Sequence, residues 1–295
     1  TISLQYMKNK IFSQKKSFLD RFFIKLIRKF GYEVIDHANL NIPSKNSEAN
    51  ENLSESGKRS INIPLGKTEI TRKVKSLTII IRSYTFGDND DGKVMLDQNK
   101  KRIFDLPKIE YTFRTIKSVI KSSELAKGSF KDVDIKIIIT DDKSNEKNLE
   151  RINQLLRSCN LKTEIIDLKD NEFDNEIKSI DIDGKNISKN MISNMRNLYK
   201  SIKIAEAQDS DLFYFLEDDY IHKKEAITEM LFTYEKISSQ LKQELFLCPA
   251  DYPYLYSSID NSKIFFGNMR HWRSVNESLL TFLTSKKMIN KYLNE

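Results

Sequence analysis

The sequence is poor in cysteine and in glycine. Cys159 and Cys248 are the only cysteines among 295 residues, too few for a disulfide framework or a cysteine-ligated zinc site. This scarcity fits a reducing compartment. The sequence has only 8 glycines, and the segment after the first expected strand reads Arg-Ser-Tyr-Thr-Phe-Gly. It therefore lacks a glycine-rich loop that could cradle phosphates.

The sequence also lacks a long apolar run. No stretch approaches the roughly 20 apolar residues that a membrane-spanning helix needs. Lysines and arginines interrupt the apolar residues of the first 30 positions, so we see no secretory leader there. We find no internal repeat. These absences lead us to expect a cytoplasmic protein.

Positive charge is concentrated near the beginning of the sequence. The net charge is +7, and most of the excess lies between Lys8 and Lys29, where Asp20 is the only acid. The range 7–30 also has apolar residues at three- and four-residue spacings, as one helix face would. Such a helix suits an anionic membrane surface, and the protein would then be peripheral at the inner face of the membrane. Packing on the main domain or on a second subunit is the other interpretation.

The composition divides the chain into three parts. We expect a basic amphipathic helix in residues 1–37, with Gly31 as its C-cap. Residues 38–72 are rich in Asn, Ser, Glu and Lys and predict a polar linker. Residues 73–295 are close to charge balance, so they offer no basic groove for nucleic acid, and no nucleic-acid partner is expected.

Residues 73–295 alternate between strand and helix patterns, which predicts the fold class. We expect strands over 77–81, 133–140, 163–168, 211–216 and 245–248, and helices over 109–122, 145–159, 191–208 and 223–241. This order predicts an α/β fold with a mostly parallel central sheet and flanking helices, as in Rossmann-like nucleotide-binding domains. The segments 86–107 and 169–190 are expected to be surface loops that could cover an active site.

Three consecutive acids follow the most apolar of the expected strands. The stretch Asp211–Tyr220 reads DLFYFLEDDY, and Glu217, Asp218 and Asp219 stand at its exit. Three unpaired carboxylates cannot all be buried, so they predict a ligand site at the carboxyl edge of the sheet. Hard oxygen ligands gathered at one point suit Mg²⁺ or Mn²⁺, which would most plausibly carry a diphosphate. A solvated acidic turn is the other interpretation.

Two further strand exits carry polar groups toward the same edge. The first exit has Arg82, Ser83 and Tyr84, and the second has Asp141 and Asp142. Because parallel strands end at one edge, these groups would form a cleft with the acidic turn. An aspartate there can accept from a base N–H, Arg82 can meet a phosphate, and Tyr84 can stack on a base. The cleft suits a ligand with a base, a ribose and a diphosphate.

At this point the sequence resembles bacterial glycosyltransferases of the GT-A fold, near the large family-2-like group. The resemblance spans roughly residues 77–286. It rests on IIIRSY (79–84), ITDDKS (139–144) and FLEDDY (215–220), the last in the position of that fold's metal-binding acidic motif. The segment RHWR (270–273) followed by SLLTF (278–282) is similar to a segment in some members.

The resemblance implies a metal-dependent transfer of sugar from a nucleotide-diphosphate donor, with inversion. Asp219 would bind the metal directly, and Glu217 would contact the ribose or a metal-bound water. One of Asp141 and Asp142 would contact the base, and Arg82 and Ser83 would line the nucleotide pocket. The implied partners are a nucleotide-sugar donor and an acceptor such as a cell-surface glycan or a lipid-linked glycan.

An inverting transfer needs a carboxylate base beside the acceptor hydroxyl. The candidates after the acidic motif are Asp251 and Glu277. His271, Trp272 and Arg273 bring the only tryptophan next to one of three histidines and could cover the diphosphate or stack on a sugar. A tryptophan buried in the core with solvated neighbours is the alternative.

Two other functions fit parts of the sequence. A nucleotidyltransferase of related α/β build would also use metal-binding acids, but it generally carries a glycine-rich loop. A non-catalytic module would bind a nucleotide or nucleic acid and leave the acidic turn structural. His222, three residues beyond Asp219, is weighed as a further metal ligand against an ordinary surface histidine.

Overall fold

The computed structural model describes residues 18–32, 41–42, 51–52, 69–85, 106–169, 172–177, 187, 189–252, 262–277 and 279–292. The chain forms two compact units, Thr1–Lys67 and Thr68–Glu295. The expected loops over 86–107 and 169–190 lie largely outside the described residues, as does the range 7–17 of the expected first helix.

The first unit contains helix α2 and one short strand pair. Helix α2 spans Phe18–Lys29, and strands β1 (Asn41–Ile42) and β2 (Glu51–Asn52) pair antiparallel. Gly31 ends the helix as expected: it has φ +85°, and Tyr32 N donates to Ile27 O over 3.2 Å. Glycine adopts this left-handed conformation without a Cβ penalty.

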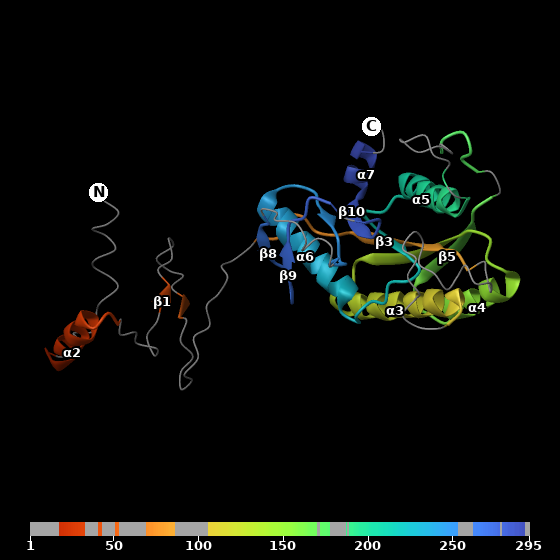
Figure 1. The fold of residues 1–295 in the computed structure, drawn as a ribbon. Helices are drawn as coiled ribbons and strands as arrows, with labels where there is room; N and C mark the ends of the chain where they lie inside the picture. The colour runs from red at the N-terminus through yellow and green to blue at the C-terminus, as the bar shows by residue number, and fades with distance from the viewer. Residues whose placement is uncertain are drawn as a thin grey trace. The chain divides into compact units, whose positions relative to one another are not determined.

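The second unit is a six-stranded sheet between layers of helices (Figure 1). Its strands are β3 (Ser76–Ser83), β4 (Asp134–Asp141), β5 (Lys162–Asp167), β6 (Leu212–Glu217), β7 (Phe246–Leu247) and β10 (Phe282–Ser285). They lie in the order β5-β4-β3-β6-β10-β7, and only β10 runs against the other five. The predicted α/β fold with a mostly parallel sheet is confirmed.

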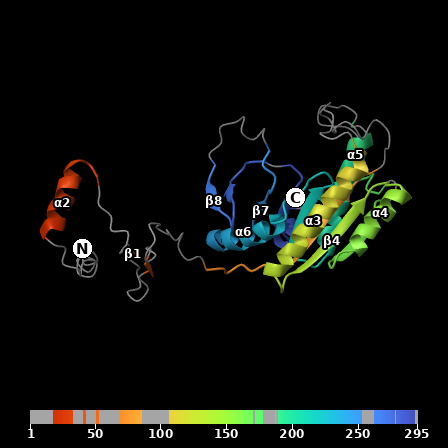
Figure 2. The same ribbon diagram turned by 90° about the horizontal axis from the view of Figure 1, so that it is seen from below.

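The helices cover both faces of the sheet. Helices α3 (Lys108–Ser129), α4 (Glu146–Arg157) and α6 (Ala226–Leu241) lie on one face, where Figure 2 shows α3 and α4 side by side. Helices α5 (Lys189–Ala207) and α7 (Lys286–Tyr292) lie on the other face (Figure 1). A small antiparallel pair, β8 (Ile264–Phe266) and β9 (His271–Arg273), stands apart from the sheet.

Continuous apolar runs form the central strands because both of their faces are buried. In β3, Ile79 and Ile81 pack into the core under α3 and α6, while Ile80 packs on the α5 side. In β6, Tyr214 and Phe215 divide between the two faces in the same way. This alternation explains why the runs lack the polar residues of a half-exposed strand.

Strand β10 was not anticipated from the sequence. It pairs antiparallel with β6, with Phe282 opposite Phe215, and separates β6 from β7. Its four residues are too short for a periodic signal, and its place depends on pairing with residues far away in the chain. Strand β7 is shorter than expected, with two residues.

Candidate functional site

The carboxyl ends of β3, β4 and β6 meet at one edge of the sheet. The registers place Ser83 beside Asp141 and Arg82 beside Glu217. The polar groups predicted to share a cleft therefore start from adjacent backbone positions. These registers follow from the parallel pairing, in which every strand delivers its exit to the same edge.

Asp218 is buried and held by three donors from the protein. Thr112 Oγ1 donates to its Oδ2 over 2.7 Å, Tyr84 N donates to the same oxygen over 3.2 Å, and Lys108 Nζ donates to Oδ1. Only 5% of Asp218 is exposed. Asp218 therefore ties the acidic turn to the start of α3 and to the exit of β3, and most of its oxygen lone pairs are already used.

Glu217 and Asp219 are more open than Asp218. Their side chains are 33% and 31% exposed, and Lys108 Nζ lies 3.8 Å from Asp219 Oδ2. Burial raises the pKa of Glu217, and the nearby Arg82 partly opposes that rise. Of the three acids, the two on either side of Asp218 are thus the more exposed to solvent.

Arg82 is a buried cation beside the acidic turn. Its Nη2 lies 3.0 Å from Glu217 Oε1, and its Nη1 donates to Asn194 Oδ1 over 3.1 Å. Its buried Nε has no hydrogen-bond partner among the described residues. A buried donor without a partner is costly. Arg82 therefore places a buried positive charge with unused hydrogen-bonding capacity at the same edge of the sheet as the acidic turn.

Asp141 and Asp142 are both buried at the exit of β4. Asp141 accepts from Ser83 Oγ (3.0 Å), Ser144 N (2.9 Å) and Ser144 Oγ (2.6 Å). Burial raises the pKa of Asp141, and these hydrogen bonds lower it in part. Asp142 accepts from Ser193 Oγ of α5. Both carboxylates are oriented by neighbouring hydroxyls at this edge of the sheet.

The residues at this edge fit a divalent cation held together with a diphosphate. Among the described residues, no group of three or more His, Cys, Asp and Glu side chains is placed to hold a metal ion by itself. Mg²⁺ usually takes one or two carboxylates and completes its shell with phosphate oxygens and waters. Asp219 and Glu217 match that smaller protein contribution.

His222 is unsuited to ligate a metal because both of its ring nitrogens are occupied. Nε2 lies 2.8 Å from Tyr214 Oη, and Nδ1 lies 3.0 Å from Tyr220 O. A ring that donates from Nδ1 to the carbonyl and accepts at Nε2 from the tyrosine is neutral. Burial lowers the pKa of His222 accordingly.

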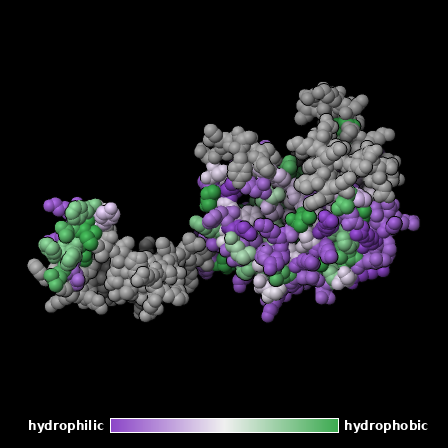
Figure 3. Space-filling view, turned by 60° about the horizontal axis from the view of Figure 1, so that its bottom comes forward, coloured by the Kyte–Doolittle hydropathy of each residue, from purple (hydrophilic) through white to green (hydrophobic). Residues whose placement is uncertain are grey.

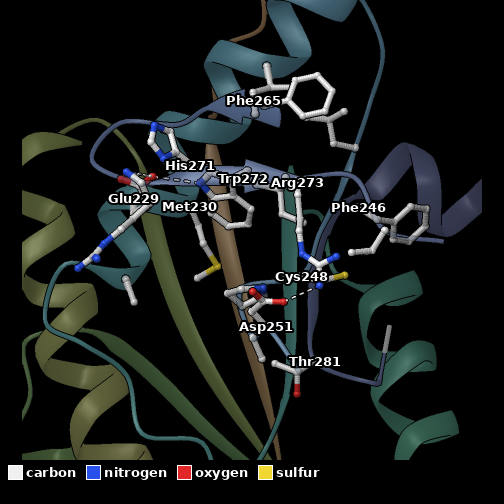
Figure 4. Close-up of a pocket in the computed structure, with 18 of the residues that line it drawn as sticks. Glu229, Met230, Phe246, Cys248, Asp251, Phe265, His271, Trp272, Arg273 and Thr281 are labelled. Atoms are coloured by element: carbon white, nitrogen blue, oxygen red, sulfur yellow. Dashed lines mark hydrogen bonds and ion pairs between the residues drawn. The ribbon is translucent and has the colours of Figure 1, made fainter. Parts of the chain in front are cut away.

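A second group of predicted residues surrounds a cavity of about 940 Å³ beside α6 and under the β8–β9 pair. Figure 4 shows Trp272 and Arg273 directed into it from β9, with Met230, Cys248 and Asp251 on its other walls. Arg273 Nη2 donates to Asp251 Oδ1 over 2.9 Å. The structure thus brings two sequence-predicted residues, Asp251 and Arg273, into one ion pair.

A pair of tyrosines connects the acidic turn with the cavity. Tyr220 directly follows Asp219 and lines the cavity. Its hydroxyl is hydrogen-bonded to that of Tyr252, 2.8 Å away, and Tyr252 is the neighbour of Asp251. The carboxyl edge and the cavity therefore share a boundary.

The remaining candidates, His271 and Glu277, are both exposed, and His271 also lines the cavity. His271 is exposed and packs edge-on against Phe266. Glu277 lies exposed in the connection from β9 to β10. Of the two candidate bases, only Asp251 lines the cavity.

Sequence reasoning missed Glu229, which fixes the β8–β9 pair. Glu229 is buried and accepts from three successive backbone amides, those of residues 268, 269 and 270. Trp272 Nε1 also donates to it over 3.1 Å. Gly267 leaves room for this arrangement, since a Cβ there would lie 2.6 Å from both Thr233 Oγ1 and Trp272 Nε1.

Lys108 and Thr112 were also missed. They lie on the first turns of α3. In the sequence, Lys108 precedes Asp218 by 110 residues and Thr112 precedes it by 106 residues. No local pattern marks either residue, because each acts through a tertiary contact. The glycine in Phe-Phe-Gly-Asn-Met was the only sequence signal near the Glu229 arrangement.

The sequence matches no protein-family model and no curated protein sequence. Among solved structures, it is similar to residues 1–349 of TarS from S. aureus, with 10% identity over 73% of this chain and 48% of that one and a TM-score of 0.37. An active-site mutant of LgtC gives 14% identity, coverage of 73% and 59%, and a TM-score of 0.36. The galactosyltransferase LgtC with donor and acceptor sugar analogues gives 16% identity, coverage of 50% and 39%, and a TM-score of 0.26. This chain spans about half the length of the first of these structures.

Proposed function

We propose that this chain is a GT-A-type glycosyltransferase, near the family-2-like group, that inverts configuration. It moves a sugar from a nucleoside-diphosphate donor to a cell-surface glycan or a lipid-linked acceptor. The observation that carries the proposal is that the three acids of the turn differ in burial and in their contacts with the protein. Protein donors hold the buried Asp218, whereas the side chains of Glu217 and Asp219 are about one-third exposed, with Glu217 beside the buried Arg82.

The donor would lie along the carboxyl edge of the sheet. Asp141 or Asp142 would accept from a base N–H, and Ser83 and Tyr84 would line the same pocket. Arg82 would direct its orphaned Nε toward a phosphate oxygen, which is a charge-assisted contact. Glu217 would contact the ribose or a metal-bound water.

Asp219, with Glu217, would hold Mn²⁺ or Mg²⁺. Such a cation neutralises the charge that develops on a leaving diphosphate. The chain's own part is to keep the two carboxylates apart and correctly oriented, which Asp218 achieves through Lys108 and Thr112. With Arg82 and Lys108 opposing three acids, the turn keeps a net negative charge that suits a cation.

The acceptor would lie on the side of Tyr220 and Asp251. Asp251 would serve as the base that takes the proton of the acceptor hydroxyl. Arg273 orients its carboxylate over 2.9 Å, and Asp251 stays 55% exposed, so it can reach a bound hydroxyl. Glu277 is the second candidate for this role. Trp272 and His271 would contact the sugar or the diphosphate from β9.

Helix α2 would place the enzyme at an anionic membrane surface. Its Leu19, Phe22 and Phe23 are exposed apolar side chains, and Figure 3 shows green and purple side chains together on this helix. Lys25, Arg28 and Lys29 supply positive charge. Such helices lie in the interface with their apolar face down. No described helix is both long and apolar enough to span a membrane.

The proposal is tested by thermal unfolding with UDP, GDP, CMP and dTDP, each with and without Mn²⁺. A ligand at about 100 times its dissociation constant adds roughly 2.7 kcal/mol to the stability of the folded state. For a domain of this size, each kcal/mol raises the midpoint by about 2–4 °C. We expect one nucleotide to raise the midpoint in the presence of the metal.

The product of the reaction then decides the class of enzyme. Release of free nucleoside diphosphate supports glycosyl transfer, whereas release of pyrophosphate would support a nucleotidyltransferase. If no nucleotide shifts the midpoint with or without Mn²⁺, the acidic turn is structural and the proposal fails.

A further inference from the structure

The cavity under the β8–β9 pair has an apolar interior and an apolar rim. Met230, Leu247, Phe265 and Trp272 are among the side chains that line it. Five of its lining residues are also large apolar side chains exposed to solvent: Ile221, Leu241, Phe246, Ile264 and Met269. Soluble proteins rarely gather exposed apolar side chains around one opening unless something binds there.

Three charged groups of the cavity, Arg273, Asp251 and Glu229, have partners within the protein. Arg273 donates to Asp251, and Glu229 accepts from three backbone amides and from the Trp272 indole. Most of the surface that lines the cavity is apolar, and burial of apolar surface is favourable in proportion to its area.

The cavity has the size and the composition of a ligand site. Its volume of about 940 Å³ lies within the roughly 300–1,000 Å³ typical of pockets that bury a small molecule. Figure 4 shows Trp272 and Phe265 on the β8–β9 side and Phe246 on the β7 side. A flexible apolar chain would touch walls from α6, β7 and the β8–β9 pair at once.

One end of the cavity leads toward the acidic turn. Tyr220 lines the cavity and directly follows Asp219. At this end, the hydroxyls of Tyr220 and Tyr252 form a hydrogen bond, and Tyr252 directly follows Asp251 in the sequence. A ligand with its apolar part under Trp272 would thus present a polar head at the boundary with the proposed donor site.

We propose that this cavity binds the apolar chain of an amphiphilic acceptor, such as a prenyl or acyl chain, with the polar head toward Tyr220 and Asp251. The inference rests on the proposed function only where it identifies the ligand as the acceptor. Binding of the ligand's apolar chain to the cavity is a separate property, and it can be measured without nucleotide, metal or turnover.

Trp272 provides a direct readout because it is the only tryptophan of the chain and lines the cavity. We would titrate the full chain with farnesyl phosphate below its micelle concentration and record tryptophan emission. We expect a saturable change in emission that inorganic phosphate does not produce. Geranyl phosphate, one isoprene unit shorter, should bind more weakly by about tenfold or more, because fewer methylene and methyl groups are buried.

Exposed residues supply variants that leave the fold intact. Ile264→Gln with Met269→Gln removes two apolar side chains of the rim and should weaken farnesyl phosphate binding about tenfold. Leu125→Gln is the matched control, since Leu125 is also an exposed apolar residue but lies on α3 and does not line the cavity. Its affinity should equal that of the parent chain.

The outcomes separate this inference from the proposed function. Farnesyl phosphate that binds with the expected chain-length dependence supports the cavity site even if no nucleotide shifts the thermal midpoint. Equal weak emission changes with inorganic phosphate and with farnesyl phosphate would overturn it. A dimer in which a second copy of the protein covers the rim would also overturn it. Sedimentation would show this as a dimer that the Ile264→Gln, Met269→Gln variant converts to monomer.

Discussion

At the scale of single residues, two neighbouring aspartates have different environments. Asp218 points into the protein and meets Lys108 and Thr112, whereas Asp219 stays partly exposed. Both aspartates lie in the turn that follows β6. The contacts of Asp218 with α3 therefore separate the acid that holds the turn from the acid that stays partly exposed.

We predict that Asp219→Asn impairs function and not stability, whereas Asp218→Ala lowers the stability of the fold. Asp219→Asn should leave the thermal midpoint of the free protein nearly unchanged and abolish both transfer and the Mn²⁺-dependent nucleotide shift, because a metal ligand is lost without a change in volume. Asp218→Ala should lower stability by about 3 kcal/mol or more, because it removes the carboxylate to which the buried Lys108 donates. Thermal unfolding of both variants, with and without nucleotide, measures the contrast.

The parent chain and Ser144→Ala serve as controls, since Ser144 lies at the cleft but donates to Asp141 and not to the acidic turn. If Asp219→Asn keeps activity within a few-fold of the parent, Asp219 is not the metal ligand. If Asp218→Ala is as stable as the parent, the three donors do not hold the turn as we argue.

At the scale of elements, the β8–β9 pair is a short structure that depends on a contact with α6. Three residues in each strand are too few to be stable alone. Glu229 gathers the amides of the connecting turn, and Gly267 lets the turn approach α6 closely. The buried carboxylate of Glu229 thus holds the pair in place, and this arrangement is possible because Gly267 has no Cβ that would collide with α6 or Trp272.

We predict that Gly267→Ala destabilises the protein by about 1–3 kcal/mol, the usual cost of forcing extra atoms into a packed site. The added Cβ would lie 2.6 Å from Trp272 Nε1, so the emission of the single tryptophan should change as well. Thermal unfolding and tryptophan emission give the two measurements.

Gly128→Ala is the matched control, since nothing lies within 4 Å of a Cβ added there. Gly128 lies within α3, where alanine is favoured over glycine by up to about 1 kcal/mol. The control should be at least as stable as the parent, with unchanged emission. A Gly267→Ala variant that behaves in the same way would show that the turn does not need the close approach to α6.

At the scale of the whole molecule, the second unit begins at Thr68. Near its start, Arg72 forms ion pairs with two distant parts of the same unit. Arg72 Nη2 lies 2.7 Å from Asp211 Oδ1, and Arg72 Nε lies 3.0 Å from Glu244 Oε1. This bidentate arrangement joins the start of β6 to the segment after α6. The expected boundary between linker and domain at residues 72 and 73 stays a prediction, and Arg72 itself belongs to the interactions of the second unit.

We predict that deletion of residues 1–67 leaves the second unit folded and its nucleotide-dependent thermal shift unchanged, because Arg72 and its partners remain. The truncated chain should lose binding to vesicles that contain anionic lipid, since α2 with its Lys25, Arg28 and Lys29 is gone. Vesicle sedimentation at low and high salt measures this effect, which salt should weaken.

The control for this experiment is the full chain with Phe22→Ser and Phe23→Ser, which keeps the positive charge and removes exposed apolar area. It should bind anionic vesicles more weakly than the parent and should not bind neutral ones. An insoluble truncated chain would show that residues 1–67 are part of the core. Undiminished vesicle binding by the truncated chain would remove α2 from that role.

The sequence by itself determined the α/β architecture and the edge of the sheet at which the acids of the proposed site lie. Apolar runs such as 77–81 and 211–216 are buried on both faces of a sheet, and the acids after them must leave the core; both are local properties of the chain. The helices and the central strands followed from periodicity for the same reason.

Only the tertiary structure decided which of the acids is buried and where the cavity lies. Lys108 meets Asp218 across 110 positions of sequence, Glu229 holds a turn some 40 residues later, and β10 enters the sheet between β6 and β7. These contacts join side chains that no local pattern relates, because their energies arise only when the whole fold has brought them within hydrogen-bonding distance.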